Sequence, residues 1–443
     1  MPLIRLLLFL VFIINEWMIK QRTMQSRRSF IRKNLIGTFL FSALGSIFPI
    51  ASLLNNRPKK SRLNALVRDW EQTDFLMDSK RTYFNTSSLG PSLKNVVEAV
   101  CSNWNHLEVN GYDGKQLAKN AHKKVGEFFN VPSEDIAMTR NTTEGINIAA
   151  KSIPLKKGDE VIMTTHEHVG GAAAWLVLEQ EIGIKVKLWD VPLSGEGLIE
   201  DLTTHISPAT RVIAVSHVLC TTGMRLPIEE IAQLCREKKI YSVIDGAQAV
   251  GMIPVNLNNI KADFYACAAH KWLFGPKGVG MLYVNPNIMK ELHPVFVGAY
   301  SDRSYNLNKK EFVLRQVAER NTYGTRNVSL MVGLETALAW NVQKGIDLIN
   351  SNATEQIRYF KSLIPLNNFE LLEPNEEFRS SILTLRSIRK DNKTLVHDLH
   401  SQYNIRTRYI YENNLDAVRI SFAIFNTKQQ IDQLALAITT LTK

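Results

Sequence analysis

The sequence predicts an α/β protein in which a large domain with a doubly wound, mainly parallel sheet precedes a smaller α/β domain. From about residue 130 to 290, short apolar runs alternate with stretches of helical periodicity. The runs are almost continuously apolar, which is typical of strands that helices cover on both faces. In such a sheet, ligands bind beyond the carboxyl ends of the strands.

Five strands are expected in the large domain. They are "DEVIMTT" (159–165), "RVIAVSHV" (211–218), "YSVIDGA" (241–247), "DFYACAA" (263–269) and "VGMLYV" (279–284). An amphipathic stretch, "PIEEIAQLCREKK" (227–239), predicts a helix between the second and third of them.

The texture of the sequence changes after about residue 328. "SLMVGLETALAWNVQKG" (329–345) predicts a long helix, "SSILTLRS" (380–387) and "AVRISFAIF" (417–425) predict strands, and "TKQQIDQLALAITTLTK" (427–443) predicts a closing helix. The expected division is a leader at 1–62, a large domain at 63–330 and a small domain at 331–443.

The net charge of +11 is concentrated in the leader. Residues 1–62 hold eleven lysine and arginine side chains against one acid, whereas the remaining 381 residues are nearly neutral. The folded part therefore offers no broad phosphate-binding surface, and no nucleic-acid partner is expected. The four cysteines show no C-x-x-C spacing, so neither a disulfide framework nor a zinc ribbon is predicted.

Within the leader, Arg27 and Arg28 stand in "SRRSFIRK", ahead of an uncharged apolar span at 35–54. This arrangement resembles a twin-arginine export signal, which implies export of a folded, cofactor-bearing protein to the periplasm by the twin-arginine machinery. A membrane anchor, through an uncleaved leader, is the alternative because the span is long enough to cross a bilayer. Whether Met1 or Met24 is the start stays open.

Polar residues follow the predicted strands at the places where those strands end. Asp245 ends "YSVID", His217 closes "RVIAVSH", and Lys271 comes just after "DFYACAAH". Buried charges at such positions need partners or a ligand to be tolerated. A cofactor with a phosphate, a pyridine nitrogen and an aldehyde would supply them.

The stretch "VIDGAQAVG", followed by "ADFYACAAHKWLFGPKGVGMLYV", resembles the signature of class V, fold-type I pyridoxal-phosphate enzymes. This group includes cysteine desulfurases, kynureninase-like lyases and isopenicillin N epimerase-like proteins. Further matches in family order extend the resemblance over most of residues 80–435. They are "TRNTTEGIN" (139–147), "EH" (167–168), "SHVLCTTGMRLPIEEI" (216–231), "YGTRN" (323–327) and "RISFAIFNT" (419–427).

The resemblance implies pyridoxal 5'-phosphate as cofactor and assigns roles around its ring. Lys271 would form the Schiff base with the aldehyde and later move the Cα proton. Asp245 would pair with the ring nitrogen, Gln248 would reach the ring hydroxyl, and His168 would stack on the ring face. His217 is a further expected cofactor contact.

The remaining assignments concern the phosphate and the substrate. Thr142 and Thr143 precede a helical stretch, so their N–H groups and hydroxyls would hold the phosphate. His270 would add a contact, and Thr325 would reach the phosphate of a neighbouring subunit, which implies a homodimer. Arg419 would clamp the carboxylate of an amino-acid substrate, a task suited to its planar guanidinium.

Ordinary structural interpretations stay open for each of these residues. Lys271 can be a plain strand-end lysine, Asp245 a helix cap, and the two threonines caps only. A rival function is a metal-dependent hydrolase, because His166 and His168 are spaced to point to one face of an extended strand. That reading leaves "NTTEG" and "GTRN" unexplained, and we expect no metal site.

The reaction is less determined than the cofactor. A desulfurase needs a nucleophilic cysteine shortly before Arg419, but no cysteine follows Cys267, and Cys220 stands near a position where desulfurases carry asparagine. We therefore expect an isopenicillin N epimerase-like enzyme acting at Cα of an amino acid by transamination, epimerisation or elimination. The alternative is desulfurase- or selenocysteine lyase-like activity without the loop cysteine. Arg406 and Arg408 would bind a second carboxylate or shape the mouth of the site.

Overall fold

The computed structural model describes residues 74–78 and 80–443, which belong to one compact unit. The leader predicted at 1–62, with its twin-arginine motif and apolar span, lies outside the described residues. Among the helices of 74–78 and 80–443, none has both the length and the apolar character needed to cross a bilayer.

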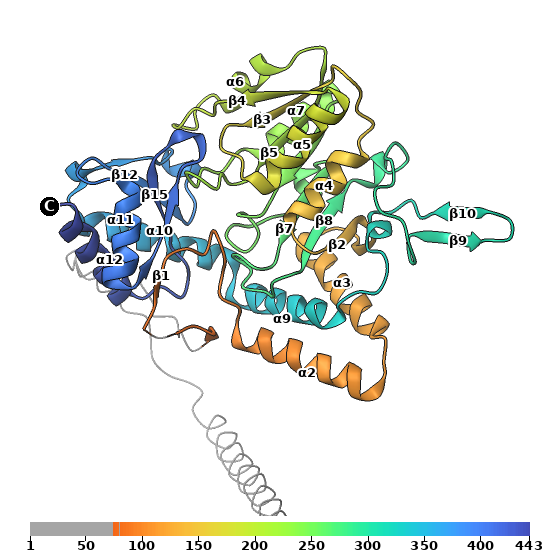
Figure 1. Cartoon of the computed structure of the whole chain (residues 1–443), viewed down its shortest axis with the longest axis horizontal. Coiled ribbons are helices and arrows are strands. Elements are labelled where there is room, and N and C mark those ends of the chain that lie inside the picture. Colours follow the sequence, from red (N-terminus) through yellow and green to blue (C-terminus); the bar gives the residue numbers. More distant parts are fainter. Residues whose placement is uncertain (1–73, 79) are drawn as a thin grey trace, which may run out of the picture. The chain divides into compact units, whose positions relative to one another are not determined.

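A seven-stranded sheet forms the centre of the large domain (Figure 1). Its strands, in spatial order, are β2 (Ile136–Thr139), β8 (Gly280–Val284), β7 (Phe264–Ala268), β6 (Tyr241–Asp245), β5 (Thr210–Ser216), β3 (Glu160–Thr164) and β4 (Lys185–Trp189). The pairs from β7 to β4 are parallel, and β8 runs antiparallel to both of its neighbours. The predicted mainly parallel α/β sheet, with its five expected strands, is confirmed.

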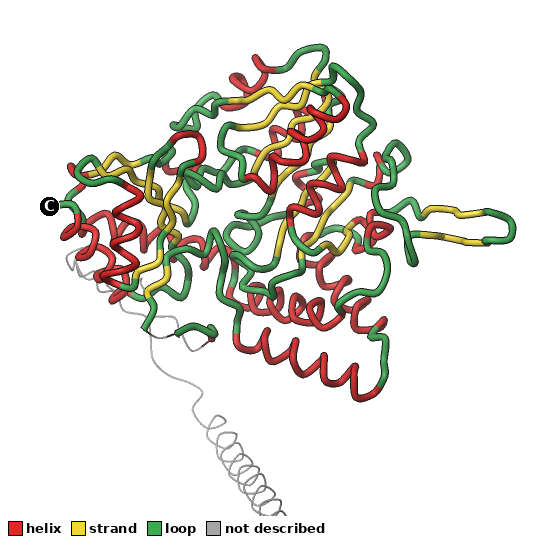
Figure 2. The backbone as a smooth tube through the Cα atoms, in the orientation of Figure 1, coloured by secondary structure: helices red, strands yellow, loops and turns green. Residues whose placement is uncertain are grey.

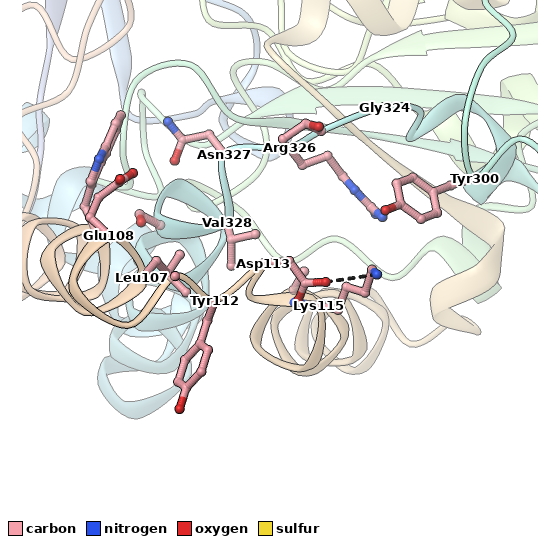
Figure 3. A pocket seen from close by; sticks show the side chains of 15 residues that line it. Leu107, Glu108, Tyr112, Asp113, Lys115, Tyr300, Gly324, Arg326, Asn327 and Val328 are labelled. Carbon is pink, nitrogen blue, oxygen red and sulfur yellow. Dashed lines mark hydrogen bonds and ion pairs between the residues drawn. The ribbon is translucent and has the colours of Figure 1, made fainter.

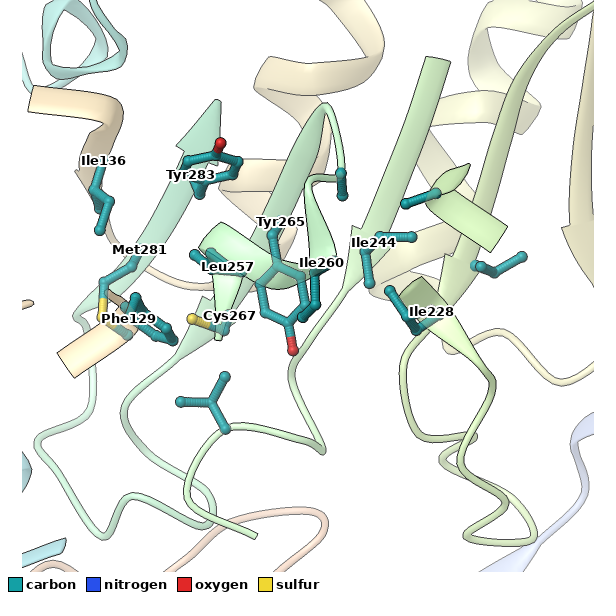
Figure 4. Packing of buried hydrophobic residues seen from close by; sticks show 14 of the residues in the cluster. Phe129, Ile136, Ile228, Ile244, Leu257, Ile260, Tyr265, Cys267, Met281 and Tyr283 are labelled. Carbon is teal, nitrogen blue, oxygen red and sulfur yellow. The ribbon is translucent and has the colours of Figure 1, made fainter. Parts of the chain in front are cut away.

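Each face of this sheet packs against its own set of helices, because successive side chains of a strand point to opposite sides. In β7, Tyr265 and Cys267 enter one core, which Figure 4 shows, while Phe264 and Ala266 enter the other. The first core contains α3 (Lys115–Phe129), α6 (Leu198–His205), α7 (Ile228–Lys238), α8 (Leu257–Ile260) and α9 (Val328–Lys344). The second contains α4 (Thr142–Ser152) and α5 (Val169–Ile182). Fully burying one Leu, Ile or Phe side chain contributes about 1.5–3 kcal/mol.

A four-stranded antiparallel sheet forms the C-terminal part of the fold. Its order is β11 (Phe369–Leu371), β12 (Ile382–Ser387), β15 (Ala417–Ser421) and β14 (Arg408–Ile410). The helices that share its core are α10 (Ile346–Leu363), α11 (Asn392–Tyr403) and α12 (Lys428–Leu441). Both strands and the closing helix predicted for this region are confirmed.

The long helix predicted at 329–345 is α9, which packs against α3 and α2 (Lys94–Asn110). The expected domain boundary between residues 330 and 331 therefore falls inside a helix, and the boundaries stay a prediction. A parallel pair between β1 (Thr82–Tyr83) and β13 (Ile405–Arg406) joins distant parts of the chain.

Sequence analysis did not predict β2, β4 or the hairpin of β9 (Asp302–Asn306) and β10 (Glu311–Leu314). Strand β2 has four residues, and in β4, an edge strand, only Trp189 is fully buried. The hairpin projects away from the sheet (Figure 2), so its side chains are largely exposed and carry no core pattern.

Candidate active site

A cavity of about 220 Å³ lies at the carboxyl ends of the central strands, where an α/β sheet binds its ligands. It opens beyond β5, β6 and β7 and reaches the first residues of α4 and α5. Its lining comprises Ser87, Ser88, Asn141, Thr142, Thr143, His168, Gly170, Ser216, Cys220, Asp245, Ala247, Gln248, His270, Lys271 and Arg408. Seven of the ten residues proposed from sequence for this site therefore meet here.

Asp245 and Lys271 are the two charged groups deep in this cavity. Burial raises the pKa of Asp245 and lowers the pKa of Lys271, and their mutual attraction opposes both shifts. The Asp245 carboxylate also accepts a hydrogen bond from the Ala247 N–H at 2.8 Å. The backbone thus fixes the orientation of this carboxylate. The lowered pKa of Lys271 increases the fraction of the amine that is neutral and nucleophilic.

The N-terminus of α4 forms a polar wall of the cavity. Asn141 caps the helix, its side chain accepting a hydrogen bond from the Glu144 N–H at 2.9 Å. Thr142 is 7% exposed, and its hydroxyl has no hydrogen-bond partner in the structure. Buried hydroxyls normally have a partner, so this one, beside the free N–H groups of a helix start, fits an anionic ligand.

His168 and Gln248 line the cavity as expected, and neighbouring groups hold both in place. His168 caps α5, with its Nδ1 accepting from the Gly170 N–H at 3.0 Å, so its Nε2 carries the proton when the ring is neutral. Gln248 donates to the Ser87 carbonyl at 2.9 Å and accepts from the Trp272 indole at 2.9 Å. Its side chain is therefore fixed by the protein itself.

The predictions for His270 and His217 have different outcomes. His270 lines the cavity, and burial next to Lys271 lowers its pKa to about 4, so it is neutral at physiological pH. His217 does not line the cavity. Its Nδ1 instead lies 2.9 Å from the Tyr265 hydroxyl, and burial lowers its pKa to about 3. A direct cofactor contact for His217 stays a prediction.

Arg419 lies behind the cavity wall and not on it. Its side chain is fully buried in β15, where it donates to the Cys220 carbonyl at 2.6 Å and the Ser88 hydroxyl at 2.9 Å. Its Nε has no partner. Arg408, its cross-strand neighbour in β14, does line the cavity and pairs with Glu412. Two guanidinium groups therefore act on this cavity, one through its wall.

Thr325 is one of the residues that line a separate cavity of about 530 Å³. Figure 3 shows this cavity with Tyr112, Tyr300 and Arg326 labelled. Sequence analysis assigned this threonine to the phosphate of a neighbouring subunit. Its absence from the lining of the 220 Å³ cavity is compatible with that assignment, which stays a prediction.

The histidine pair considered for a metal site is engaged in two different ways. His166 Nδ1 lies 2.8 Å from the Thr221 hydroxyl and its Nε2 3.4 Å from the Asn413 amide, whereas His168 caps α5. In the described part of the chain, no three His, Cys, Asp or Glu side chains come together in a metal-binding group.

Sequence reasoning gave no role to Glu167 or to the serines of the cavity. The Glu167 carboxylate accepts hydrogen bonds from the Ser216 hydroxyl at 2.5 Å and the Thr164 hydroxyl at 2.8 Å. Burial, with the nearby Asp245 charge, raises its pKa to about 7. The signal was present in the motif "HEH", since a charged residue directly after a buried strand needs partners. Ser87 and Ser88 carried no such signal.

Replacing Glu167 with glutamine is expected to flatten the pH dependence of stability. Because the folded-state pKa is raised from 4.5 to about 7, the folded protein binds more protons than the unfolded chain in that interval. Wild-type stability therefore falls as pH rises through about 7, and the glutamine variant lacks this component. Thermal unfolding from pH 5 to 8 measures it, with the exposed Glu179→Gln as control; parallel wild-type and Glu167→Gln profiles would refute it.

The comparisons with known proteins agree with this geometry. The sequence profile described as aminotransferase class-V matches residues 94–434, which is most of the chain. The chain belongs to the aminotransferase class-V family. A probable cysteine desulfurase of Pyrococcus abyssi is 28% identical over 295 residues, covering 64% of this chain and 73% of that protein.

Solved structures share the fold of this class-V enzyme. The apo cysteine desulfurase of Thermococcus onnurineus NA1 superposes with a TM-score of 0.76 at 21% identity, over 84% of this chain and 97% of that one. The cystine C–S lyase C-DES, in complex with cysteine persulfide, gives 0.75 at 24%, over 82% and 98%. A C-DES variant with glycine linked to its pyridoxal-phosphate cofactor gives 0.76 at 25%, over 83% and 99%.

The residues of the cavity fit pyridoxal phosphate, the cofactor of this class-V enzyme. Lys271 presents an amine for the aldehyde, and Asp245 presents a carboxylate for the ring nitrogen. The unpartnered Thr142 hydroxyl, at the start of α4, matches the needs of the phosphate.

Thr142→Val is expected to weaken cofactor binding by about 10- to 100-fold, the effect of losing one hydrogen bond to a charged group. Valine has the same shape, and the lost hydroxyl has no partner in the protein, so the apo form should keep its unfolding temperature. Equilibrium titration with pyridoxal phosphate, followed by absorbance, gives the affinity. An unchanged affinity would remove Thr142 from the phosphate site.

Proposed function

We propose that this enzyme cleaves a carbon–sulfur bond of a sulfur-containing α-amino acid by β-elimination, and that the sulfur departs on the substrate's own leaving fragment. The observation that carries this proposal is the position and state of the thiols. No cysteine follows Cys267, so the segment before Arg419 has no nucleophile to take sulfur. Cys220 is the one thiol of the cavity lining, and burial raises its pKa to about 11.

A thiol with such a pKa stays protonated near neutral pH and is a poor nucleophile. The fold is shared with the cystine C–S lyase named above as well as with a desulfurase. These relatives support the desulfurase and lyase alternative better than the isopenicillin N epimerase-like branch. None of the proteins named here is such an epimerase, so that branch assignment stays a prediction.

When bound, pyridoxal phosphate accepts the electrons of the bond that is broken at Cα. The chain supplies the acid–base and electrostatic functions around it. Lys271, which burial shifts towards its neutral form, can take the Cα proton, and Asp245 can keep a ring nitrogen protonated. Arg408 in the lining and Arg419 behind it make the cavity wall near β14 and β15 electropositive and suited to a carboxylate.

For cystine, the balanced reaction consumes one water and yields cysteine persulfide, pyruvate and ammonia. The decisive experiment incubates the holoenzyme with cystine and with cysteine and quantifies pyruvate and alanine. We expect pyruvate from cystine in stoichiometric amounts with ammonia. Alanine as the sole product would instead demonstrate desulfuration. An inverted or transaminated amino acid would show that the enzyme is an epimerase or a transaminase and would contradict the proposal.

A second candidate function is a desulfurase in which Cys220 accepts the sulfur, since this thiol does line the cavity. Cys220→Ala separates the two functions. Under the elimination proposal the variant keeps its rate of pyruvate formation within about threefold, because only a small buried side chain is lost. A loss of several orders of magnitude, with alanine as the wild-type product, would establish the desulfurase.

Two proposals from the sequence concern the protein's surroundings. A homodimer is proposed because Thr325 matches a residue that serves a neighbouring site, and sedimentation at several concentrations tests it. Export is proposed from Arg27 and Arg28, and replacing both with lysine in the full chain should retain the protein in the cytoplasm.

A further inference from the structure

A second polar cavity, of about 180 Å³, lies between α10 and the segment before β12. It shares no lining residue with the catalytic cavity. Its lining comprises Arg225, Asn350, Thr354, Ile357, Arg358, Lys361, Glu376, Arg379 and Ser380. Four of the nine are cations, and they come from three separate parts of the chain: the hairpin after β5, the helix α10 and the segment at 376–380.

Most of these cations have a carboxylate partner. Arg358 pairs with Glu355, on the same helix. Lys361 and Arg379 share Glu373, with Arg379 Nη2 at 3.4 Å from it. One acid thus serves two cations, so the positive charge of this group is only partly neutralised.

Arg225 is the exception, because its positive charge has no carboxylate partner in the part of the chain that the structure describes. Its half-buried guanidinium donates to the backbone carbonyl of Glu377, and no ion pair is found for it among the described residues. Burial lowers its pKa, and no acidic group offsets that shift. Glu376, the one acid of the lining, has a largely exposed side chain and lies 3.8 Å from Arg358. A half-buried cation without a counter-ion favours binding of an anion.

Ser380 gives an independent indication of a ligand. Its side chain is 3% exposed, and its hydroxyl has no hydrogen-bond partner in the structure. Buried hydroxyls are nearly always paired, so the unpaired hydroxyl of a residue that lines the cavity is available to a polar group from outside the protein. The hydroxyl of Thr354, from α10, already donates to the carbonyl of Asn350 and can still accept.

We propose that this cavity binds a compact tetrahedral oxyanion of the phosphate type. Arg225 is its main charge partner, Arg358 and Arg379 contribute further positive charge, and the Ser380 hydroxyl donates a hydrogen bond. Cations from three parts of the chain can each contact a different oxygen of a tetrahedral anion. The proposal goes beyond the carbon–sulfur lyase activity and does not depend on it.

A bound anion would connect the two sheets of the molecule. Arg225 belongs to the hairpin that follows β5, where Val218 and Arg225 pair, and Ser380 lies just before β12 of the small sheet. The backbone N–H of Arg225 already donates to the Phe378 carbonyl at 2.8 Å. Occupancy therefore adds a connection across this junction and should stabilise the folded chain by mass action.

The experiment is thermal unfolding of the holoenzyme, saturated with pyridoxal phosphate so that the catalytic phosphate site is filled. Inorganic phosphate is titrated against potassium chloride at matched ionic strength. Phosphate stabilises many proteins without saturation, so the comparison with variants decides. We expect a saturating rise in unfolding temperature for wild type and for the exposed control Arg303→Gln. For Arg225→Gln, the phosphate concentration that gives half of the maximal rise should increase at least about tenfold, as expected when a hydrogen bond to a charged group is lost.

If Arg225→Gln does not fold, Ser380→Ala provides the test, because the Ser380 hydroxyl has no partner to lose among the described residues. For this variant, the phosphate concentration that gives half of the maximal rise should increase several-fold. Sulfate, of the same tetrahedral class, should reproduce the saturating response. The proposal fails if wild type shows no saturating response, or if Arg225→Gln and Ser380→Ala respond as wild type does. It also fails as to ligand class if malonate stabilises the protein and phosphate does not.

Discussion

Lys271→Ala is expected to lower turnover by more than about 10³-fold, because one amine is proposed both to bind the cofactor aldehyde and to move the Cα proton. The side chain is a buried lysine whose pKa is lowered by burial and held up by Asp245. Its removal leaves Asp245 without this attraction, but burial already raises the pKa of that carboxyl and favours its neutral form, so the fold should persist. The variant should still bind pyridoxal phosphate without forming a covalent bond to it.

The measurement combines the absorption spectrum with reduction by borohydride and peptide mass analysis. In wild type, reduction should attach the cofactor to the peptide that contains Lys271. The exposed Lys290→Ala is the control and should match wild type in spectrum and rate. Labelling of a different lysine in wild type, or substantial turnover by Lys271→Ala, would show that the cofactor is held elsewhere.

Asp245→Asn is expected to reduce kcat/KM by about 10²–10³-fold while leaving the cofactor bound, since it removes one preorganised charge from the reacting ring. Asparagine has nearly the same shape, and its carbonyl can still accept from the Ala247 N–H. What changes is the charge that is proposed to keep the ring nitrogen protonated. The same change also removes the attraction that opposes the lowered pKa of Lys271.

Two measurements check this prediction. Steady-state kinetics on the substrate that gives pyruvate should show the loss mainly in kcat, and the absorption spectrum should show that the cofactor stays bound. Asp347→Asn, an exposed change in the first turn of α10, serves as the comparison. A kcat within threefold of wild type would mean that Asp245 is only a structural cap.

The fold could be predicted to a useful degree because the strands that carry the site are the most buried ones. Strands β3, β5, β6, β7 and β8 are apolar on both faces, so their local pattern identifies them without tertiary information. Edge strand β4 and the hairpin at 302–314 lack that pattern, because solvent replaces one or both of their packing partners. Their presence depends on neighbours that a local reading cannot supply.

Part of the candidate site could likewise be predicted from local sequence. Asp245 ends strand β6, and His168 and Lys271 come shortly after β3 and β7; the parallel arrangement of those strands brings their carboxyl ends to one edge. Thr142 and Thr143 were visible as the start of a helix. These positions follow from local sequence together with one rule of topology.

Other features depended on long-range packing. The burial of Arg419 behind Ser88 and Cys220 joins residues more than 190 positions apart, and no local pattern encodes such a contact. The same holds for the contact of His217 with the Tyr265 hydroxyl and for the carboxyl of Glu167 beside Asp245. Burial, which decides these pKa values, is a property of the assembled fold.

The amino-acid sequence alone predicted the sheet, the family, the cofactor and the lysine expected to bind it, because each has a strong local signature. The tertiary structure decided which thiol lies in the cavity, which arginine lines it, and where a second cationic cavity forms at Arg225. The physical reason is that charge and nucleophilicity depend on desolvation and on neighbours distant in sequence, and only the packed chain brings these together.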